Sequence, residues 1–345
     1  MPSSASSEFA SAIAAADTGA IPFDEFMALV LYGENGFYTA GGSAGRRGDF
    51  ITSPEVGPLF GAVMARAITG CWRELGEPAD FHVVEVGAGP GTLARAVLAA
   101  RPEGLTSYTA VEVSAAQRNR HPASVVSLAT MPTEPFVGMI IANELLDNLP
   151  FRLVVFDGGW REAFVTLGTD GTAAEVLSAP IQPLPAWLPT TAAHGTRVPV
   201  QDNAATWVDQ ARRLVSGGRV VAIDYTTAST TVLATMPWRE WLRTYRGHER
   251  GSHYLRDLGH QDITTQVAVD QLPPAETVRS QRQFLLRWGI DELVEEGRRV
   301  WNEQAASPTV AALTMRSRVR EAEALLDPAG LGGFTVLEWT PANPR

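Results

Sequence analysis

The 345-residue chain contains no lysine, and its single cysteine is Cys71. Without lysine the chain can form no Schiff base with a carbonyl substrate, and it has no P-loop lysine for a nucleotide phosphate. One cysteine allows neither an intrachain disulfide nor a metal site made of several cysteines. A lone thiol is typical of a reducing compartment. We expect no metal site, because His248, His253 and His260 lie in a glycine-containing stretch with no cysteine or acidic cluster beside them.

Long apolar runs and positive charge are also scarce. No apolar run approaches the roughly 18–20 residues that span a bilayer. The first 18 residues are rich in serine and alanine and contain no arginine, unlike a signal or transit peptide. The net charge of −10 argues against a nucleic-acid or anionic-membrane surface. We therefore expect a cytoplasmic protein with no membrane insertion and no nucleic-acid partner.

Strand and helix patterns alternate through the first half of the chain. Helical spacing at 21–32 and a Ser53-Pro54 start signal predict helices at 21–32 and from 53 to about 75. Short apolar runs predict strands at 81–86, 107–113, 124–128 and 137–142, with a helix at 92–100. This alternation predicts right-handed βαβ units and a parallel sheet, the α/β class.

The pattern changes after residue 150. Asp157-Gly158-Gly159 lies between two strand-like runs and predicts an inserted hairpin. A helix at 203–216 and a buried strand at 219–225 resume the α/β pattern, and 226–261 reads as mixed and loop-like. Helices at 280–304 and 307–326 and a strand at 334–339 complete the chain.

The first strand runs into the glycine turn Gly87-Ala88-Gly89-Pro90-Gly91. Such a turn lets the backbone approach a ligand closely. The spacing departs from the dinucleotide pattern G-x-G-x-x-G, because Thr92 stands where the third glycine would be. Glu85 would repel a pyrophosphate, but it suits the cationic amino end of S-adenosylmethionine (SAM).

Glu112 ends the second strand, about 20 residues beyond the glycine turn, where an acidic side chain can accept both ribose hydroxyls of an adenosine ligand. A lone glycine turn or a lone glutamate would be ordinary. Their order favours an adenosine-type cofactor, and we identify SAM, held by Glu85, Gly87, Ala88, Gly89, Gly91 and Glu112.

Three polar residues, Asn143, Glu144 and Asp147, follow the fourth strand. Ligands of open parallel sheets lie beyond the carboxyl ends of the strands, so we place Asn143 on the cofactor and consider Glu144 and Asp147 catalytic candidates. The competing interpretation is structural: Asn143 caps a following helix, and the two acids favour its positive end.

Three segments resemble the MidA-like family of SAM-dependent methyltransferases, which includes a mitochondrial arginine methyltransferase that assists respiratory complex I assembly. They are Gly-Asp-Phe-Ile-Thr-Ser-Pro-Glu at 48–55, the cofactor loop at 85–93, and Asn-Glu-Leu-Leu-Asp-Asn-Leu-Pro at 143–150. The resemblance implies a Rossmann-like class I fold and a protein substrate methylated on arginine (a respiratory-chain subunit among the candidates). We expect Asp49 to help close the N-terminal segment over the cofactor, with a solvated loop as the alternative. Thr226 and Gln266 depart from the family pattern, which has glycine and histidine there.

For an arginine acceptor, we expect Glu144 and Asp147, one helical turn apart, to hold the guanidinium. Alternative functions are a catalytically weak SAM-binding assembly factor and an NAD-dependent oxidoreductase. We divide the chain into an N-terminal helical segment, 1–80, packing on the cofactor site, and a Rossmann-like domain, 81–345. Insertions at about 151–200, 226–261 and 280–330 form a hairpin and helical substrate region.

Overall fold

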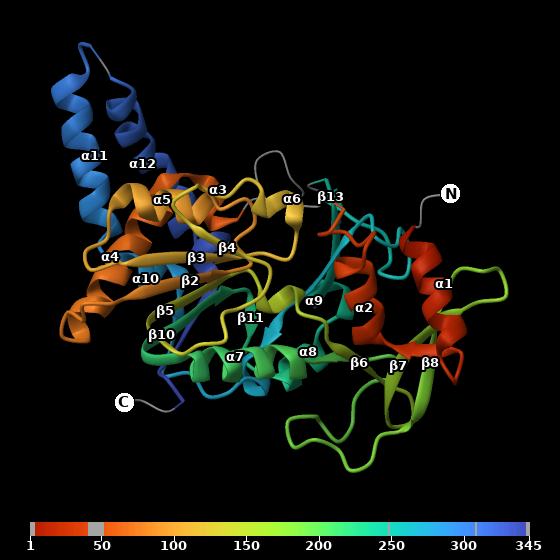
Figure 1. Cartoon of the computed structure of the whole chain (residues 1–345). Coiled ribbons are helices and arrows are strands. Elements are labelled where there is room, and N and C mark those ends of the chain that lie inside the picture. The colour runs from red at the N-terminus through yellow and green to blue at the C-terminus, as the bar shows by residue number, and fades with distance from the viewer. Residues whose placement is uncertain (1–3, 41–51, 248, 308, 343–345) are drawn as a thin grey trace.

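A computed structural model describes residues 4–40, 52–247, 249–307 and 309–342 (Figure 1). Its centre is a seven-stranded sheet of order β16-β17-β10-β5-β2-β3-β4. The strands are β2 (His82–Val86), β3 (Ser107–Val111), β4 (Val126–Leu128), β5 (Phe136–Asn143), β10 (Val215–Asp224), β16 (Thr277–Ser280) and β17 (Thr335–Trp339). The pairs among β2, β3, β4, β5 and β10 are parallel, and β17 is antiparallel to both of its neighbours. The expected α/β class is confirmed.

Helices cover both faces of this sheet (Figure 1). On β5, Met139 and Ile141 join one hydrophobic cluster, whereas Ile140 and Ala142 join another. Burial on both faces explains why such strands read as continuous apolar runs. One cluster includes side chains from α4 (Pro58–Glu74), α5 (Thr92–Ala100), α10 (Gln281–Arg287), α11 (Ile290–Gln304) and α12 (Val310–Leu326), and the other includes those of α7 (Asp202–Leu214).

A second sheet is built around the expected hairpin. Strands β6 (Arg152–Phe156) and β7 (Trp160–Leu167) pair across the Asp157-Gly158-Gly159 turn. The sequence reading missed their partners β1 (Ala20–Pro22), β8 (Ala173–Pro180) and β9 (Arg197–Val200). Much of β8 is exposed, so it lacks the hydrophobic alternation by which half-buried strands are recognised.

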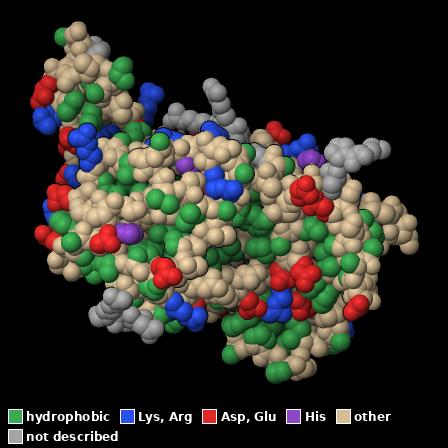
Figure 2. Space-filling view, in the orientation of Figure 1, with side chains coloured by type: hydrophobic (Ala, Val, Ile, Leu, Met, Phe, Trp, Pro, Cys, Tyr) green, Lys and Arg blue, Asp and Glu red, His purple; other side chains and the backbone are tan. Residues whose placement is uncertain are grey.

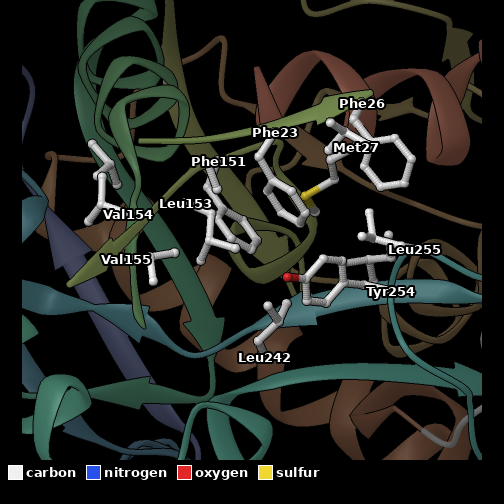
Figure 3. Close-up of a cluster of buried hydrophobic side chains, with 14 of the residues drawn as sticks. Phe23, Phe26, Met27, Phe151, Leu153, Val154, Val155, Leu242, Tyr254 and Leu255 are labelled. Atoms are coloured by element: carbon white, nitrogen blue, oxygen red, sulfur yellow. The ribbon is translucent and has the colours of Figure 1, made fainter. Parts of the chain in front are cut away.

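The N-terminal helices α1 (Ala5–Ala15) and α2 (Phe23–Tyr32) pack with this second sheet. Figure 3 shows the cluster, in which Phe23 of α2 lies against Phe151 and Tyr254, with ring centroids 5.4 and 5.2 Å away. By contrast, α4 packs on the central sheet. The first 80 residues are thus shared between two hydrophobic clusters, one at each sheet. The expected domain division at residue 80 stays a prediction.

Several expected elements are broken into shorter ones. The helix expected from 53 is two helices, α3 (Ser53–Val56) and α4, separated by Gly57. The helix expected at 280–304 divides into α10 and α11 at Gly289, which has a left-handed φ of 77°. The loop-like stretch contains β11 (Thr226–Thr227), α8 (Thr230–Thr235), α9 (Trp238–Trp241), β12 (Leu242–Arg246) and β13 (Glu249–Arg250).

The remaining elements are short. Strand β14 (Asp262–Thr265) pairs antiparallel with β12, and β15 (Val267–Ala268) pairs parallel with β11. The others are α6 (Ala115–Arg118) and three single 3₁₀ turns, η1 (Leu146–Asn148), η2 (Val269–Gln271) and η3 (Leu331–Gly333). Among the described residues, no helix combines the length and apolar character needed to cross a membrane.

Candidate functional site

The glycine turn after β2 has the backbone that its sequence predicts. Gly87, Gly89 and Gly91 have φ values of 72°, 52° and 77°, in the left-handed region that favours glycine. The N–H groups of Gly87 and Ala88 both donate to the carbonyl of Val111, at 3.0 Å, which ties the turn to β3. A Cβ on Gly89 would have no atom within 4 Å, so this side of the turn is open to a ligand.

A cleft of about 530 Å³ lies against this turn, at the carboxyl ends of β2, β3 and β5. The face of the molecule that is drawn in Figure 2 has a hollow near its middle, with hydrophobic side chains along it. Of the predicted site residues, the cleft is lined by Glu85, Gly87, Ala88, Gly89, Glu112, Asn143 and Glu144. Gly91 is the N-cap of α5 and does not line the cleft. Asp49 lies outside the described residues.

Glu112 is held by two backbone groups at the end of β3. The N–H of Gly89 donates to Oε2 at 2.9 Å, and the N–H of Ser114 donates to Oε1 at 2.8 Å. A carboxylate offers about four lone-pair sites, so each oxygen can accept another hydrogen bond. Glu112 is thus fixed in place with the acceptors that two neighbouring ribose hydroxyls require.

Glu85 lies beneath the glycine turn and is almost fully buried. The hydroxyl of Tyr108 donates to its Oε2 at 2.8 Å. Burial raises the pKa of Glu85 to about 8, although the Tyr108 hydrogen bond acts in the opposite direction. A cation bound in the cleft would favour the ionised carboxylate. Glu85 therefore fits the ammonium of the methionine part of SAM.

Buried polar atoms without partners also line the cleft. Asn143 Oδ1, Ser114 Oγ and Gln117 Oε1 have no hydrogen-bond partner in the described chain. Buried polar atoms are normally paired, so three unpaired atoms on residues that line one cleft indicate a site for a polar ligand. Together with Glu112, they fit an adenosine ligand.

The chain turns sharply after β5. Glu144 has a left-handed φ of 53°, and its N–H donates to the carbonyl of Ile223 at 2.8 Å. The buried carboxylate of Asp224 accepts the N–H of Leu146 at 2.9 Å and that of Asp147. The expectation that Glu144 and Asp147 lie one turn apart on a helix is wrong, because the backbone at Glu144 is not helical and only η1 follows. The side-chain amide of Asn143 donates to Glu144 at 3.1 Å and caps no helix.

Asp147 lies behind the cleft wall instead of lining it, and its side chain is fully enclosed. The hydroxyls of Tyr225 and Thr264 both donate to its Oδ2, whereas its Oδ1 has no hydrogen-bond partner in the described chain. Burial raises the pKa of Asp147, and these hydroxyls act in the opposite direction.

Three further carboxyl groups, those of Glu144, Asp224 and Asp262, lie close enough to Asp147 to feel its charge. Asp262 accepts hydrogen bonds from the Tyr38 hydroxyl at 3.0 Å and the Asn148 amide at 3.1 Å. Burial, followed by the charge of Asp147, raises the pKa of Asp262 to about 7 and that of Glu144 to about 8. The same two causes raise the pKa of Asp224. Within the described ranges no arginine or histidine forms an ion pair with any of these four acids, so the cluster suits a cationic partner.

Two tyrosines that the sequence reading missed, Tyr32 and Tyr38, also line the cleft. Tyr32 and Tyr38 stack with centroids 5.5 Å apart and planes 15° apart. The hydroxyl of Tyr32 donates to the carbonyl of Asn148 at 3.0 Å, which joins α2 to η1. No local pattern marks either tyrosine, because their partners lie more than 100 residues away.

The two departures from the family pattern are accommodated away from the cleft. The Thr226 hydroxyl bonds that of Thr335 at 2.8 Å, and the Gln266 side chain accepts from the Thr227 hydroxyl. Neither Thr226 nor Gln266 lines the cleft. Among the residues described here, no three histidine, cysteine, aspartate or glutamate side chains are grouped to hold a metal ion.

Comparison with known proteins supports the same cofactor. Residues 63–285 match the family described as "Putative S-adenosyl-L-methionine-dependent methyltransferase". A crystal structure from Burkholderia thailandensis, bound to S-adenosyl-homocysteine, is 26% identical, covers 100% of this chain and 96% of its own, and has a TM-score of 0.78.

Curated relatives point to the same family. The Drosophila melanogaster protein named protein arginine methyltransferase NDUFAF7 homolog is 33% identical over 192 residues, which is 46% of this chain and 44% of that protein. The human protein arginine methyltransferase NDUFAF7 is 38% identical over 82 residues, 24% of this chain and 19% of its own. The matches thus span less than half of these curated relatives. The SAM cofactor expected from the glycine turn is confirmed, and the chain belongs to the MidA-like family of SAM-dependent methyltransferases.

Proposed function

We propose that this protein transfers the methyl group of SAM to an arginine side chain of a protein substrate. The observation that carries the proposal is the set of carboxyl groups at and behind the cleft wall, Glu144, Asp147 and Asp262, which have no cationic partner in the described chain. The names of the curated relatives support an arginine acceptor. A respiratory-chain subunit is the substrate that the family resemblance implies.

Bound in the cleft, SAM supplies an electrophilic methyl carbon next to a sulfonium. Glu112 would accept the ribose hydroxyls, and Glu85 would receive the cationic amino group. Such contacts would align the methyl group, and alignment of this kind contributes several kcal/mol to lowering the barrier of an in-line displacement. Tyr32 and Tyr38 form an aromatic wall of the same cleft, which suits a planar guanidinium.

The acceptor poses an electrostatic problem, because a guanidinium has a pKa above about 12 and its nitrogens are poor nucleophiles. Glu144 lines the cleft and can accept two guanidinium N–H groups, one of them from the nitrogen that attacks, which concentrates electron density on that nitrogen. That nitrogen forms the new N–C bond as the S–C bond breaks, and it then loses a proton. Since the pKa of Glu144 is raised to about 8, its carboxylate can take up that proton near neutral pH.

The test compares Glu144→Gln with wild type in transfer from methyl-labelled SAM to a cell lysate. The chain has 28 arginines of its own, so a reaction without lysate measures self-labelling. We expect transfer to fall at least about 100-fold, since the charged partner is lost, while the affinity for S-adenosylhomocysteine changes less than about 3-fold. Glu134→Gln is the matched control, because Glu134 is exposed and does not line the cleft. Wild-type transfer by Glu144→Gln would show that Glu144 does not hold the guanidinium or take up its proton.

The alternative of a catalytically weak assembly factor is tested by the same assay. Its sequence basis was the pair of departures at Thr226 and Gln266, and both are paired away from the cleft. Labelled product with the wild-type protein contradicts that alternative, and its absence at saturating SAM supports it.

A further inference from the structure

A second cavity, of about 190 Å³, lies in a separate part of the molecule. It is formed by α9, β12 and the segment at 250–254, and it shares no lining residue with the cofactor cleft. Two of its lining residues, Leu242 and Tyr254, belong to the buried cluster in Figure 3. The cavity thus rests on the packed core shared by α2 and the second sheet.

Positive charge is concentrated at this cavity in an otherwise acidic chain. Arg239, Arg243 and Arg250 line it, and no aspartate or glutamate does. No ion pair to a carboxylate is present for these three arginines in the described part of the chain. A fourth arginine, Arg197, lies nearby, but both oxygens of Glu175 pair with it, at 2.6 and 2.7 Å.

The three guanidiniums are held by neutral groups. Arg243 Nε donates to the carbonyl of Glu240 at 2.7 Å, and Arg250 donates to the carbonyl of Arg239 at 2.9 Å. The guanidinium of Arg239 lies 4.4 Å from the ring centroid of Trp238. Each guanidinium has five N–H donors, so these contacts restrain the side chains and leave both charge and donors available.

His253 adds a further donor to the same cavity. Its Nδ1 accepts the N–H of Leu255 at 3.3 Å, so in the neutral ring the proton is on Nε2. Partial burial and then the charges of Arg197 and Arg239 lower the pKa of His253, with Arg256 acting in the same direction and Glu175 against them. The histidine therefore reports the positive potential of its surroundings.

We propose that this cavity is a binding site for a phosphate group. Three arginines from different elements can each contact a different oxygen of a tetrahedral dianion, which a flat carboxylate offers less well. The volume corresponds to about six waters at roughly 30 Å³ each, enough for a phosphate group. The group can belong to free inorganic phosphate or to a phosphorylated side chain of a protein.

The experiment titrates the full-length protein with inorganic phosphate at constant ionic strength, using calorimetry and the NMR titration of His253. We expect saturable binding and a higher pKa of His253 in the phosphate complex, because the bound anion offsets the arginine charges. Arg243→Gln and Arg250→Gln are expected to weaken binding about 10-fold or more, since each removes charged hydrogen bonds. The matched control is Arg246→Gln, because Arg246 lies exposed on β12 and does not line the cavity.

A second arm uses a phosphoserine peptide and its unphosphorylated form. Tighter binding of the phosphopeptide than of inorganic phosphate assigns the phosphate group to a protein, and the reverse assigns it to the free ion. Either result supports the site if Arg243→Gln weakens the binding and Arg246→Gln changes it less than 2-fold. An absence of saturable binding in both arms, or an equal loss in Arg243→Gln and Arg246→Gln, overturns the proposal.

Discussion

Replacing Glu112 by glutamine tests the cofactor site with little change of shape. The carboxylate accepts the N–H groups of Gly89 and Ser114 and has lone pairs left for the ribose. Glutamine has one acceptor oxygen, so its NH₂ group faces either a backbone N–H or a ribose hydroxyl. A hydrogen bond to a charged group contributes about 1.5–3 kcal/mol. A loss of about 2–3 kcal/mol corresponds to a roughly 30- to 140-fold weaker affinity for S-adenosylhomocysteine.

The assay is calorimetric titration of wild type, Glu112→Gln and the exposed control Glu134→Gln with S-adenosylhomocysteine. A thermal melt of each protein without ligand separates loss of binding from loss of fold. We expect Glu134→Gln to bind like wild type. Binding by a well-folded Glu112→Gln within 2-fold of wild type would refute the assignment of Glu112 to the ribose.

Three further expectations concern the buried acids. Folded Glu85 keeps its proton up to a pKa of about 8, whereas an unfolded glutamate ionises near 4.5, so its contribution to stability falls as pH rises between these values. Glu85→Gln should flatten the decline in the free energy of unfolding between pH 5 and 8 by on the order of a few kcal/mol, measured by urea denaturation; an unchanged slope would contradict this. With Glu144 as the base, kcat/KM should rise with pH toward about 8, and a flat profile would argue against that role. Asp224→Asn should destabilise the fold by about 1–3 kcal/mol in thermal melts, because it weakens the hydrogen bonds from the N–H groups of Leu146 and Asp147. An unchanged melting temperature would show that these hydrogen bonds do not stabilise the fold.

The central sheet was predictable because its signal is local. Strand β5 is apolar on both faces, and the glycine turn joins β2 to α5 within a few residues. The cofactor side of the site follows from the same locality, since Glu112 directly follows β3, the strand next to β2. The short elements of 226–261 were not predictable, because β12 gains its partner β14 only in the folded chain.

The acceptor side of the site depends on contacts between distant segments. Tyr38 and Asp262 are 224 residues apart in the sequence, and Asp147 and Thr264 are 117 apart. The helical expectation at Glu144 followed from local signals, the capping potential of Asn143 and the three-residue spacing of Glu144 and Asp147. In the structure, the turn after β5 instead hydrogen-bonds to Ile223 and Asp224 of β10, and its backbone at Glu144 is not helical.

The central claim is that the methyl group of SAM reaches an arginine. The most direct measurement is mass spectrometry of a lysate treated with the protein and SAM carrying a deuterated methyl group. We predict labelled methylarginine with wild type and with Glu134→Gln, and none with Glu144→Gln. Label found only on lysine, on a carboxyl group or on small molecules would contradict the claim.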